Sequence, residues 1–311
     1  MKSPSGEGHR GLRLRLPATS ANLGPGFDAV AVALDFYLEI EAKPASEFSI
    51  DATGRDAARC SQLQDNLILG VYQQILSQNN QPIPPLAIRM ANGIPLGMGC
   101  GSSAAGILAG IALAIHFGDL GWGPERILET ATTLEGHPDN VAACWLGGFV
   151  ACGTVDKTLQ LARVEPPPHW HAIVVLPRTP LATSKARAIL PDKYSRTDVV
   201  TNIQSASILG LAFAQARGDL LRSAMQDRVH QPYRAAICPL LRPLLPLAGQ
   251  HHILGVALSG AGPAVLVVVE SEAGLSIASQ AICSAVRGLE DPEMLISRFA
   301  LNPAESLELP T

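Results

Sequence analysis

The chain has 311 residues, of which 47% are hydrophobic and 16% charged, and its formal net charge is −4. This length allows one large or two ordinary domains with a sizeable core, and the lack of a basic excess argues against nucleic acid as a partner. No apolar run reaches the roughly 18 residues of a membrane span, so we expect a cytoplasmic protein without a membrane partner. The six cysteines are scattered without a Cys-x-x-Cys pair, which predicts reduced thiols and no zinc site.

The N-terminal third begins with a predicted disordered leader, residues 1–10. The period-two alternation of Leu12–Leu16 predicts a half-buried strand that ends at Pro17. Residues 18–28, with the sequence ATSANLGPGFD, then bring hydroxyls, an amide and a carboxylate close together. An ordinary polar turn explains this segment about as well as a ligand site does. Beyond it, strands are predicted over residues 29–42 and 86–90, and an amphipathic helix over 65–78.

The most informative stretch is residues 95–106, PLGMGCGSSAAG, in which three alternating glycines precede two serines and a predicted helix over residues 104–117. Glycines permit positive φ and close approach to the backbone, and a helix start presents unpaired N–H groups. Such a place suits a phosphate. A glycine-rich turn before a core helix would explain the glycines alone. Ser102 and Ser103 favour the phosphate interpretation, because they can cap the helix and also bind the metal ion of a nucleotide.

Two common phosphate loops do not fit this stretch. A Walker loop needs Gly-Lys-Ser/Thr, and no lysine lies between Lys43 and Lys157. The pattern Gly99-x-Gly101-x-x-Ala104 matches the Rossmann fingerprint on paper. However, residues 91–96 separate it from the preceding strand, and no second strand with an acidic end follows. We therefore expect a nucleotide loop of another kind.

The second half of the chain begins after a predicted linker, the Pro166-Pro167-Pro168 run, so we place a domain boundary near residue 165. Before the linker, Glu135-Gly136-His137-Pro138-Asp139-Asn140 offers side chains for a metal, a proton or a hydroxyl, although a capped helix start explains Asp139 and Asn140 equally well. The order of strands and helices after the linker predicts a ferredoxin-like α+β domain. The remaining helices are expected over residues 124–134, 183–187, 198–216, 219–228 and 273–288, and the remaining strands over 149–153, 172–176, 254–258, 264–269 and 294–299.

Three separated motifs occur in a fixed order: Pro17–Asp28 (PATSANLGPGFD), Pro95–Ala105 (PLGMGCGSSAA) and Leu258–Pro263 (LSGAGP). Together they resemble the GHMP kinases, and His137–Val141, Thr183-x-x-x-Arg187 and His230-x-Pro232-x-Arg234 fit the homoserine kinase branch of that family. The resemblance spans about residues 12–265. It implies an α+β fold with a ribosomal-S5-like ATP-binding domain, residues 1–165, and a ferredoxin-like domain, residues 166–311. It also implies a homodimer that uses ATP to phosphorylate the side-chain hydroxyl of L-homoserine, on the route from aspartate to threonine.

The resemblance also implies residue roles. Mg²⁺ would be held by Ser103 and Glu135, and the catalytic candidates are Asn140, Asp139 and His137. Either Asp139 is a weak base, or the hydroxyl attacks directly while Asn140 and His137 orient it. A zwitterionic substrate needs cations for its carboxylate and an anion for its ammonium; the residues implied for substrate binding are Arg187, Arg234, Asp28, Asn22 and Thr183. ATP would be bound by Pro95, Leu96, Gly97, Met98, Gly99, Cys100, Gly101, Ser102, Ser103, Ala104 and Ala105.

The chain departs from the family pattern at two points. Cys100 stands where a leucine is usual, which should matter little because backbone amides face the phosphates. The link from Glu135 to His137 is several residues shorter than in many homoserine kinases.

Two other functions are alternatives to homoserine phosphorylation. A mevalonate or diphosphocytidyl-methylerythritol kinase should carry a lysine near the first motif, and none is present there; a non-catalytic ligand sensor should lose Ser103 or Glu135, and both are present.

Overall fold

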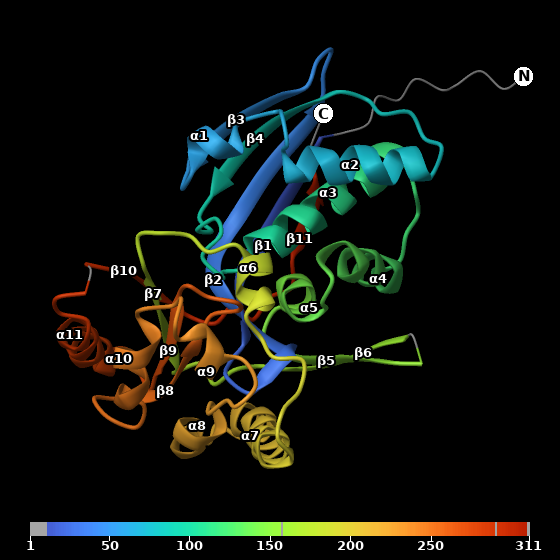
Figure 1. Cartoon of the computed structure of the whole chain (residues 1–311). Helices are drawn as coiled ribbons and strands as arrows, with labels where there is room; N and C mark the ends of the chain where they lie inside the picture. The colour runs from blue at the N-terminus through green and yellow to red at the C-terminus, as the bar shows by residue number, and fades with distance from the viewer. Residues whose placement is uncertain (1–10, 157, 290, 310–311) are drawn as a thin grey trace, which may run out of the picture.

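The computed structural model describes residues 11–156, 158–289 and 291–309, which form two α+β halves packed against each other (Figure 1). The predicted leader, residues 1–10, lies outside the described residues. The strands are β1 (Leu12–Asn22), β2 (Gly26–Pro44), β3 (Ser49–Gly54), β4 (Leu86–Asn92), β5 (Phe149–Val155), β6 (Thr158–Val164), β7 (His171–Leu176), β8 (Ile253–Leu258), β9 (Val265–Val269), β10 (Glu293–Ser297) and β11 (Glu305–Glu308). The helices are α1 (Ala57–Cys60), α2 (Leu67–Gln78), α3 (Ser102–Gly118), α4 (Pro124–Glu135), α5 (Asp139–Leu146), α6 (Thr183–Ala188), α7 (Arg196–Ala214), α8 (Gly218–Ala224), α9 (Gln231–Arg234), α10 (Leu241–Leu244) and α11 (Leu275–Ala285), with short 3₁₀ turns at Leu245–Leu247 and Glu272–Gly274.

The first half is a seven-stranded sheet with its main strands in the order β11-β1-β2-β4-β3, and with β5 and β6 continuing from β2. Neighbouring strands are antiparallel except β3 and β4, which are parallel because α1 and α2 connect them. The edge strand β11 comes from the C-terminal end of the chain and pairs with β1. The first half therefore contains strands from both ends of the described chain.

Helix α3 is the central helix of this half. Its apolar residues, from Ala104 to Phe117, are almost all buried, and it packs against α2, α4 and the sheet (Figure 1). Helix α2 begins as the sequence predicts, because the side chain of Asn66 accepts hydrogen bonds from the backbone amides of Ile68 and Leu69. The buried α3 places its N-terminus, and with it the glycine-rich loop, at the junction of the two halves.

The second half has four antiparallel strands in the order β10-β7-β9-β8, which is the ferredoxin-like order and confirms that prediction. Alternate residues of its central strands enter different cores. Val174 of β7 and Leu266 of β9 belong to the core shared with the first half, whereas Ile173 and Val267 face α10 and α11. Because both faces of this sheet are covered, β7 and β9 are continuous apolar runs rather than alternating ones.

The sequence prediction was wrong at β1, which does not end at Pro17 but continues to Asn22. Pro17 lies opposite Tyr37, next to a shift in the pairing register, so its missing N–H group falls where the ladder is already irregular. The segment considered as a polar turn is thus largely strand. The elements β3, α1, β6 and β11 were not predicted from the sequence.

The described residues bear on two expectations from composition. All six cysteines are free thiols, as predicted. Within the residues that the structure describes, no helix has the length and apolar character needed to cross a bilayer.

Candidate active site

The three motifs of the sequence meet at one place between the halves. The hydroxyl of Ser259 donates to the carbonyl oxygen of Gly99 at 2.7 Å and lies 2.9 Å from the hydroxyl of Ser20. The backbone amide of Thr19 donates to the carbonyl oxygen of Cys100 at 3.1 Å. The backbone amide of Gly260 donates to the carbonyl oxygen of Ala21 at 3.0 Å. Segments that are far apart in the sequence are therefore fastened to one another by short polar contacts.

The glycine-rich loop has the backbone conformation that its sequence predicts. Gly97, Gly99 and Gly101 have φ values of 70°, 81° and 72°. The site is also crowded, because a Cβ at Gly101 would lie 1.9 Å from the Thr19 hydroxyl oxygen, and one at Gly99 would lie 2.2 Å from the Ser259 carbonyl oxygen. Glycine is needed at both positions to let this loop lie against the neighbouring motifs.

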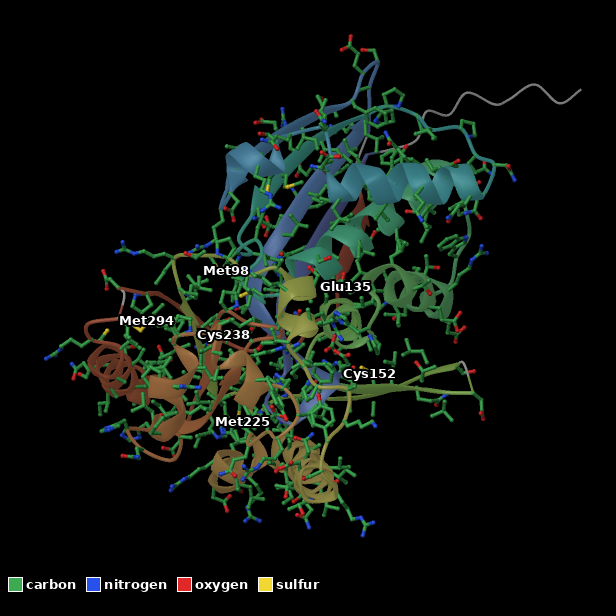
Figure 2. The ribbon with its side chains drawn as sticks, viewed as in Figure 1. Met98, Glu135, Cys152, Met225, Cys238 and Met294 are labelled. Atoms are coloured by element: carbon green, nitrogen blue, oxygen red, sulfur yellow. The ribbon has the colours of Figure 1, made fainter. Side chains whose placement is uncertain are left out.

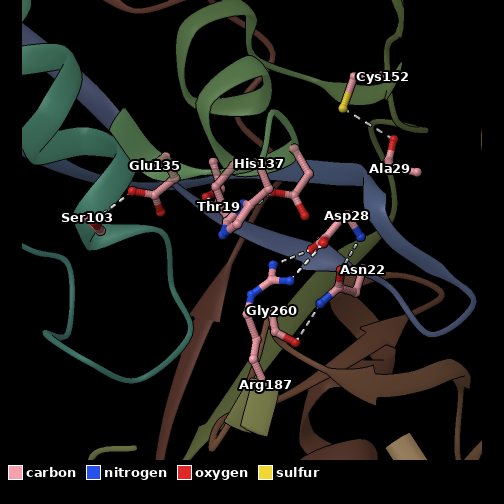
Figure 3. Close-up of polar contacts among 12 residues, drawn as sticks. Thr19, Asn22, Asp28, Ala29, Ser103, Glu135, His137, Cys152, Arg187 and Gly260 are labelled. Atoms are coloured by element: carbon pink, nitrogen blue, oxygen red, sulfur yellow. Dashed lines mark hydrogen bonds and ion pairs between the residues drawn. The ribbon is translucent and has the colours of Figure 1, made fainter. Parts of the chain in front are cut away.

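The predicted capping of α3 by serine was wrong. The N-cap is Gly101, and no side chain caps the helix. The Ser103 hydroxyl instead donates to the Glu135 carboxylate, with 2.7 Å between Oγ and Oε2 (Figure 3). The amides of the first helical turn therefore have no intrahelical acceptor and no capping side chain, which leaves the positive end of a long helix available to an anion.

Two cavities adjoin at this loop. The smaller has a volume of about 110 Å³ and the larger, an open cleft, about 920 Å³; Gly97, Ser102 and Ser103 line both. The larger cleft runs between α2 and β4, past Leu67, Met90 and Ile94. The residues that the sequence singled out and that line the smaller cavity are Asn22, Asp28, Gly97, Gly99, Gly101, Ser102, Ser103, Glu135, His137, Asp139, Asn140, Thr183, Arg187 and Arg234.

Some predicted loop residues line neither cavity. Ala104 and Ala105 are fully buried in α3. Cys100 is also buried, and its carbonyl oxygen accepts a hydrogen bond from the backbone amide of Thr19. The carbonyl of Met98 accepts a hydrogen bond from the backbone amide of Ala264, and Figure 2 shows Met98 and Glu135 near the junction of the two halves. Pro95 lines neither cavity, whereas Leu96 lines the larger one.

The acidic and basic ends of the smaller cavity are already paired. Arg187 makes a two-pronged ion pair with Asp28, at 2.9 Å and 2.6 Å (Figure 3), and this hydrogen bonding raises the pKa of Arg187. The backbone amide of Asp28, at a φ of 54°, donates to the side-chain oxygen of Asn22, whose amide group donates to the Gly260 carbonyl. Asn22 therefore shapes the turn that presents Asp28.

Behind this ion pair lies a second arginine, Arg234, which is only 1% exposed. Its Nε donates to the carbonyl of Ala186 at 3.1 Å, and its Nη1 donates to Nδ1 of His230 at 3.1 Å. Nε2 of His230 donates to the Gly24 carbonyl at 2.8 Å, so the ring is neutral; burial lowers its pKa to about 4. Burial and the charge of Arg187 lower the pKa of Arg234. The turn before this pair is fixed by Asp227, whose carboxylate accepts three backbone amides, a role that the sequence analysis missed.

A polar cluster occupies the remaining wall of the smaller cavity. Asp139 is 1% exposed, and its Oδ1 lies 2.7 Å from Nδ1 of His137 and 2.6 Å from the backbone nitrogen of Asn140, which donates to it. Burial lowers the pKa of His137, but the hydrogen bond and charge of Asp139 outweigh it, and the pKa is raised. The side-chain oxygen of Asn140 accepts a hydrogen bond from the Thr19 hydroxyl at 2.6 Å.

Two carboxylate environments in the site could attract a cation. Burial raises the pKa of Glu135, which the Ser103 hydroxyl partly offsets. In addition, ligand atoms of Asp28, His137 and Asp139 lie within 4.8 Å of one another. We interpret this second group as a hydrogen-bonded cluster, because Arg187 neutralises Asp28 and His137 is bonded to Asp139.

Comparison with known proteins gives a consistent picture. The GHMP kinase N-terminal domain family matches residues 66–148, and the GHMP kinase C-terminal family matches residues 212–288. The homoserine kinase of Solibacter usitatus is 45% identical over 83% of this chain and 84% of its own, and that of Deinococcus radiodurans is 39% identical over 86% and 85%. The crystal structure of homoserine kinase from Cytophaga hutchinsonii superposes with a TM-score of 0.80 at 23% identity, covering 99% of this chain and 100% of that one.

Proposed function

The chain belongs to the homoserine kinases within the GHMP kinase family, and from this premise we propose that it transfers the γ-phosphoryl group of ATP to the side-chain hydroxyl of L-homoserine. The product is O-phospho-L-homoserine. The observation that carries this proposal is the smaller cavity, where a helix N-terminus suited to phosphate faces an acid and two arginines suited to an amino acid.

The nucleotide is proposed to lie across the two adjoining cavities. Its triphosphate would meet the free amides at the start of α3, beside Ser102 and Ser103. Its adenosine would occupy the larger cleft, which has apolar walls from Leu67 and Met90. This arrangement directs the γ-phosphate toward the smaller cavity.

Mg²⁺ fits the chemistry of the Ser103 and Glu135 pair. A hydroxyl oxygen and a carboxylate oxygen lie 2.7 Å apart next to the phosphate loop. Mg²⁺ prefers oxygen ligands and takes only a few from the protein when phosphate oxygens supply its other ligands. When bound, the ion would neutralise charge on the phosphate oxygens. The pKa of Glu135 is raised because burial outweighs the hydrogen bond from Ser103 and the nearby charges of His137 and Arg187, and a bound cation would stabilise its ionised form.

The substrate is proposed to replace the ion pair between Asp28 and Arg187. An amino acid carries both charges, so its ammonium can pair with Asp28 while its carboxylate pairs with Arg187. Arg234 lies behind Arg187 in the same cavity. A ligand with only one charge would leave the other protein group unpaired in a partly buried place, which is costly. The cavity therefore favours zwitterions over ligands that carry a single charge.

At the reacting hydroxyl, Asn140 and His137 are proposed as orienting groups. Oδ1 of Asp139 already faces His137 and the Asn140 amide, so Asp139 holds these neighbours in place. Nε2 of His137 is the ring nitrogen left for the substrate or the transferring phosphoryl group. A loose phosphoryl-transfer transition state depends on positioning and charge stabilisation more than on a strong base.

The experiment that tests this function is steady-state ADP release with ATP and Mg²⁺ across L-homoserine, L-serine, L-threonine and mevalonate. We expect turnover with homoserine and little with mevalonate, which lacks the ammonium. Arg187→Ala should raise the KM for homoserine at least about 30-fold, because it leaves Asp28 unpaired, and should barely change the KM for ATP. Lys185→Ala, on the same helix α6 but outside the cavity, is the matched control. Equal damage to both KM values would instead place Arg187 on the phosphates.

A further inference from the structure

A third cavity lies in the second half of the molecule and shares no lining residue with the two cavities of the active site. Its volume of about 380 Å³ falls within the usual range of small-molecule sites. Residues of α8, α9, β8 and the 3₁₀ turn at Leu245–Leu247, together with the connections between them, form its walls. Met225, labelled in Figure 2, and Val256 are each 2% exposed and give it an apolar part.

The unpaired charges of this cavity are positive. Among the described residues that line it, Asp227 is the only acidic one, and its carboxylate already accepts three backbone amides of the turn that follows. Arg222 and Arg228 also line the cavity, and no residue that the structure describes forms an ion pair or a hydrogen bond with either guanidinium. The lining therefore has a net charge of +1, which suits a ligand with one negative charge.

The side chain of Arg222 is held against the opposite wall of the cavity. A Cβ at Gly249 would lie 2.7 Å from Cδ of Arg222, so the aliphatic part of this arginine lies across the backbone of residue 249. Ala248, the residue before it, lines the cavity. This contact restrains Arg222, which therefore loses less conformational entropy when it pairs with an anion.

A nearly buried amide group in the same cavity lacks a partner. Gln231 is 4% exposed, and its Oε1 accepts a hydrogen bond from the backbone amide of Leu258 at 2.7 Å. This bond fixes which end of the side-chain amide is oxygen. No described residue accepts a hydrogen bond from Nε2, and because Gln231 lines the cavity, this donor faces the open space. An unsatisfied donor is costly, and an oxygen atom of a ligand would satisfy it.

We propose that this cavity binds a small organic carboxylate. The carboxylate pairs with Arg222 and Arg228, one of its oxygens accepts a hydrogen bond from Nε2 of Gln231, and its apolar part lies on Met225 and Val256. A free amino acid is disfavoured, because the single carboxylate of the lining is already bonded to backbone amides and leaves no partner for an ammonium. The cavity thus differs in charge from the proposed substrate site.

The cavity is connected to the active site through the segment from Asp227 to Arg234. Asp227 fixes the backbone of His230, whose ring accepts a hydrogen bond from Arg234. Gln231 holds the backbone of Leu258, the first residue of the LSGAGP motif. A ligand that bridges Arg228 and Gln231 restrains this segment in the arrangement that places Arg234 in the substrate cavity, so it should lower the KM for homoserine. This last expectation rests on the proposed function, whereas binding of the carboxylate does not.

The first test is isothermal titration calorimetry of the full chain with isovalerate, a branched carboxylate without an ammonium. The wild type should bind it with a Kd of about 1 mM, and the neutral isoamyl alcohol should not bind. The double variant Arg222→Gln, Arg228→Gln should raise the Kd at least about 30-fold. Arg242→Gln removes the same charge from an exposed arginine of α10 outside the cavity and should change nothing. The proposal fails if isovalerate shows no saturable binding below about 20 mM, or if the double variant binds it normally.

The second test locates the bound carboxylate. Gln231→Glu keeps an acceptor for the Leu258 amide but replaces the Nε2 donor with a carboxylate oxygen, so it should abolish isovalerate binding in a protein that thermal unfolding shows to be folded. Arg187→Gln, in the substrate cavity, should leave isovalerate binding unchanged. Loss of binding in Arg187→Gln with normal binding in Gln231→Glu would place isovalerate in the active site and overturn the proposal.

The third test measures the connection to the active site. Saturating isovalerate should lower the wild-type KM for homoserine about threefold, leave the KM for ATP unchanged, and have no effect on the double variant. A rise in the KM for homoserine that the double variant shares would show competition at Arg187 and contradict the proposed site. An unchanged KM in a protein that binds isovalerate would overturn the connection through Asp227 and Gln231. A chain that binds isovalerate but does not phosphorylate homoserine would contradict the proposed function alone.

Discussion

At the residue scale, His230 and Arg234 form a buried pair in which the hydrogen bonds require a neutral histidine. His230 donates from Nε2 to the Gly24 carbonyl and accepts from Arg234 at Nδ1, so both ring nitrogens are used while the ring is neutral. A proton on Nδ1 would face the Arg234 guanidinium in a site without water access. Phe27 stacks on the same ring at 5.3 Å and completes the enclosure. The position of Arg234 therefore depends on His230 staying neutral.

This arrangement predicts acid destabilisation. The pKa of His230 is about 4 in the folded chain, against about 6.5 for histidine in an unfolded chain. As the pH falls from about 6.5 toward about 4, histidine binds a proton in the unfolded state but not in the folded state. The free energy of unfolding therefore falls, by up to about 3 kcal/mol. Urea unfolding at pH 7.5 and pH 5 should show a smaller drop for His230→Gln than for the wild type. Equal drops for the two proteins would contradict the prediction.

The family resemblance, rather than any local pattern, led to the prediction of Asp28, Arg187 and Arg234 as site residues. Their internal contacts could not be predicted, because the pairing of Asp28 with Arg187 joins residues 159 positions apart. Ser259 holds two motifs together through partners 160 and 239 positions away, and no local signal marks that role. Which polar groups satisfy one another is decided by the fold.

At the element scale, the start of α3 depends on glycine for two separate reasons. Gly101 has a φ of 72°, and a Cβ there would lie 1.9 Å from the Thr19 hydroxyl oxygen. Gly121 has a similar φ of 60° but nothing within 4 Å of a Cβ. Comparison of the two separates backbone strain from loss of space.

Gly101→Ala should therefore abolish most nucleotide binding, whereas Gly121→Ala should only lower stability by about 1–2 kcal/mol. The alanine at position 101 pushes the loop away from β1 and displaces the amides that face the phosphate. ATP affinity by isothermal titration calorimetry, together with thermal unfolding, measures both effects. Normal ATP affinity in a folded Gly101→Ala protein would show that the amides of this loop do not hold the triphosphate.

Elements with a strong local pattern were predicted, and those stabilised only by neighbours were not. Helix α2 has a capping asparagine and an apolar face, and it begins as expected at Asn66. The strand β11 is exposed along its whole length and exists because β1 offers it an edge. Pro17 was taken as a strand end because proline removes a donor, but the register shift beside it lets β1 continue.

At the scale of the whole molecule, α7 supports the proposed substrate site from behind through one residue, Asn202. The side chain of Asn202 donates to the Pro25 carbonyl at 2.7 Å and accepts from the backbone amide of Arg228 at 3.1 Å. One residue of α7 thus holds both the turn that carries Asp28 and the segment that leads to His230. The larger cleft, where adenosine is proposed to bind, has no such connection to α7.

Asn202→Ala should therefore raise the KM for homoserine about tenfold and leave the KM for ATP nearly unchanged, because losing these hydrogen bonds frees the turn around Asp28 but not the phosphate loop. Gln204→Ala, on an exposed part of the same helix, should change neither value. Initial rates over ranges of homoserine and ATP concentration measure both KM values. An equal rise in the two KM values for Asn202→Ala would show that α7 supports the whole cleft.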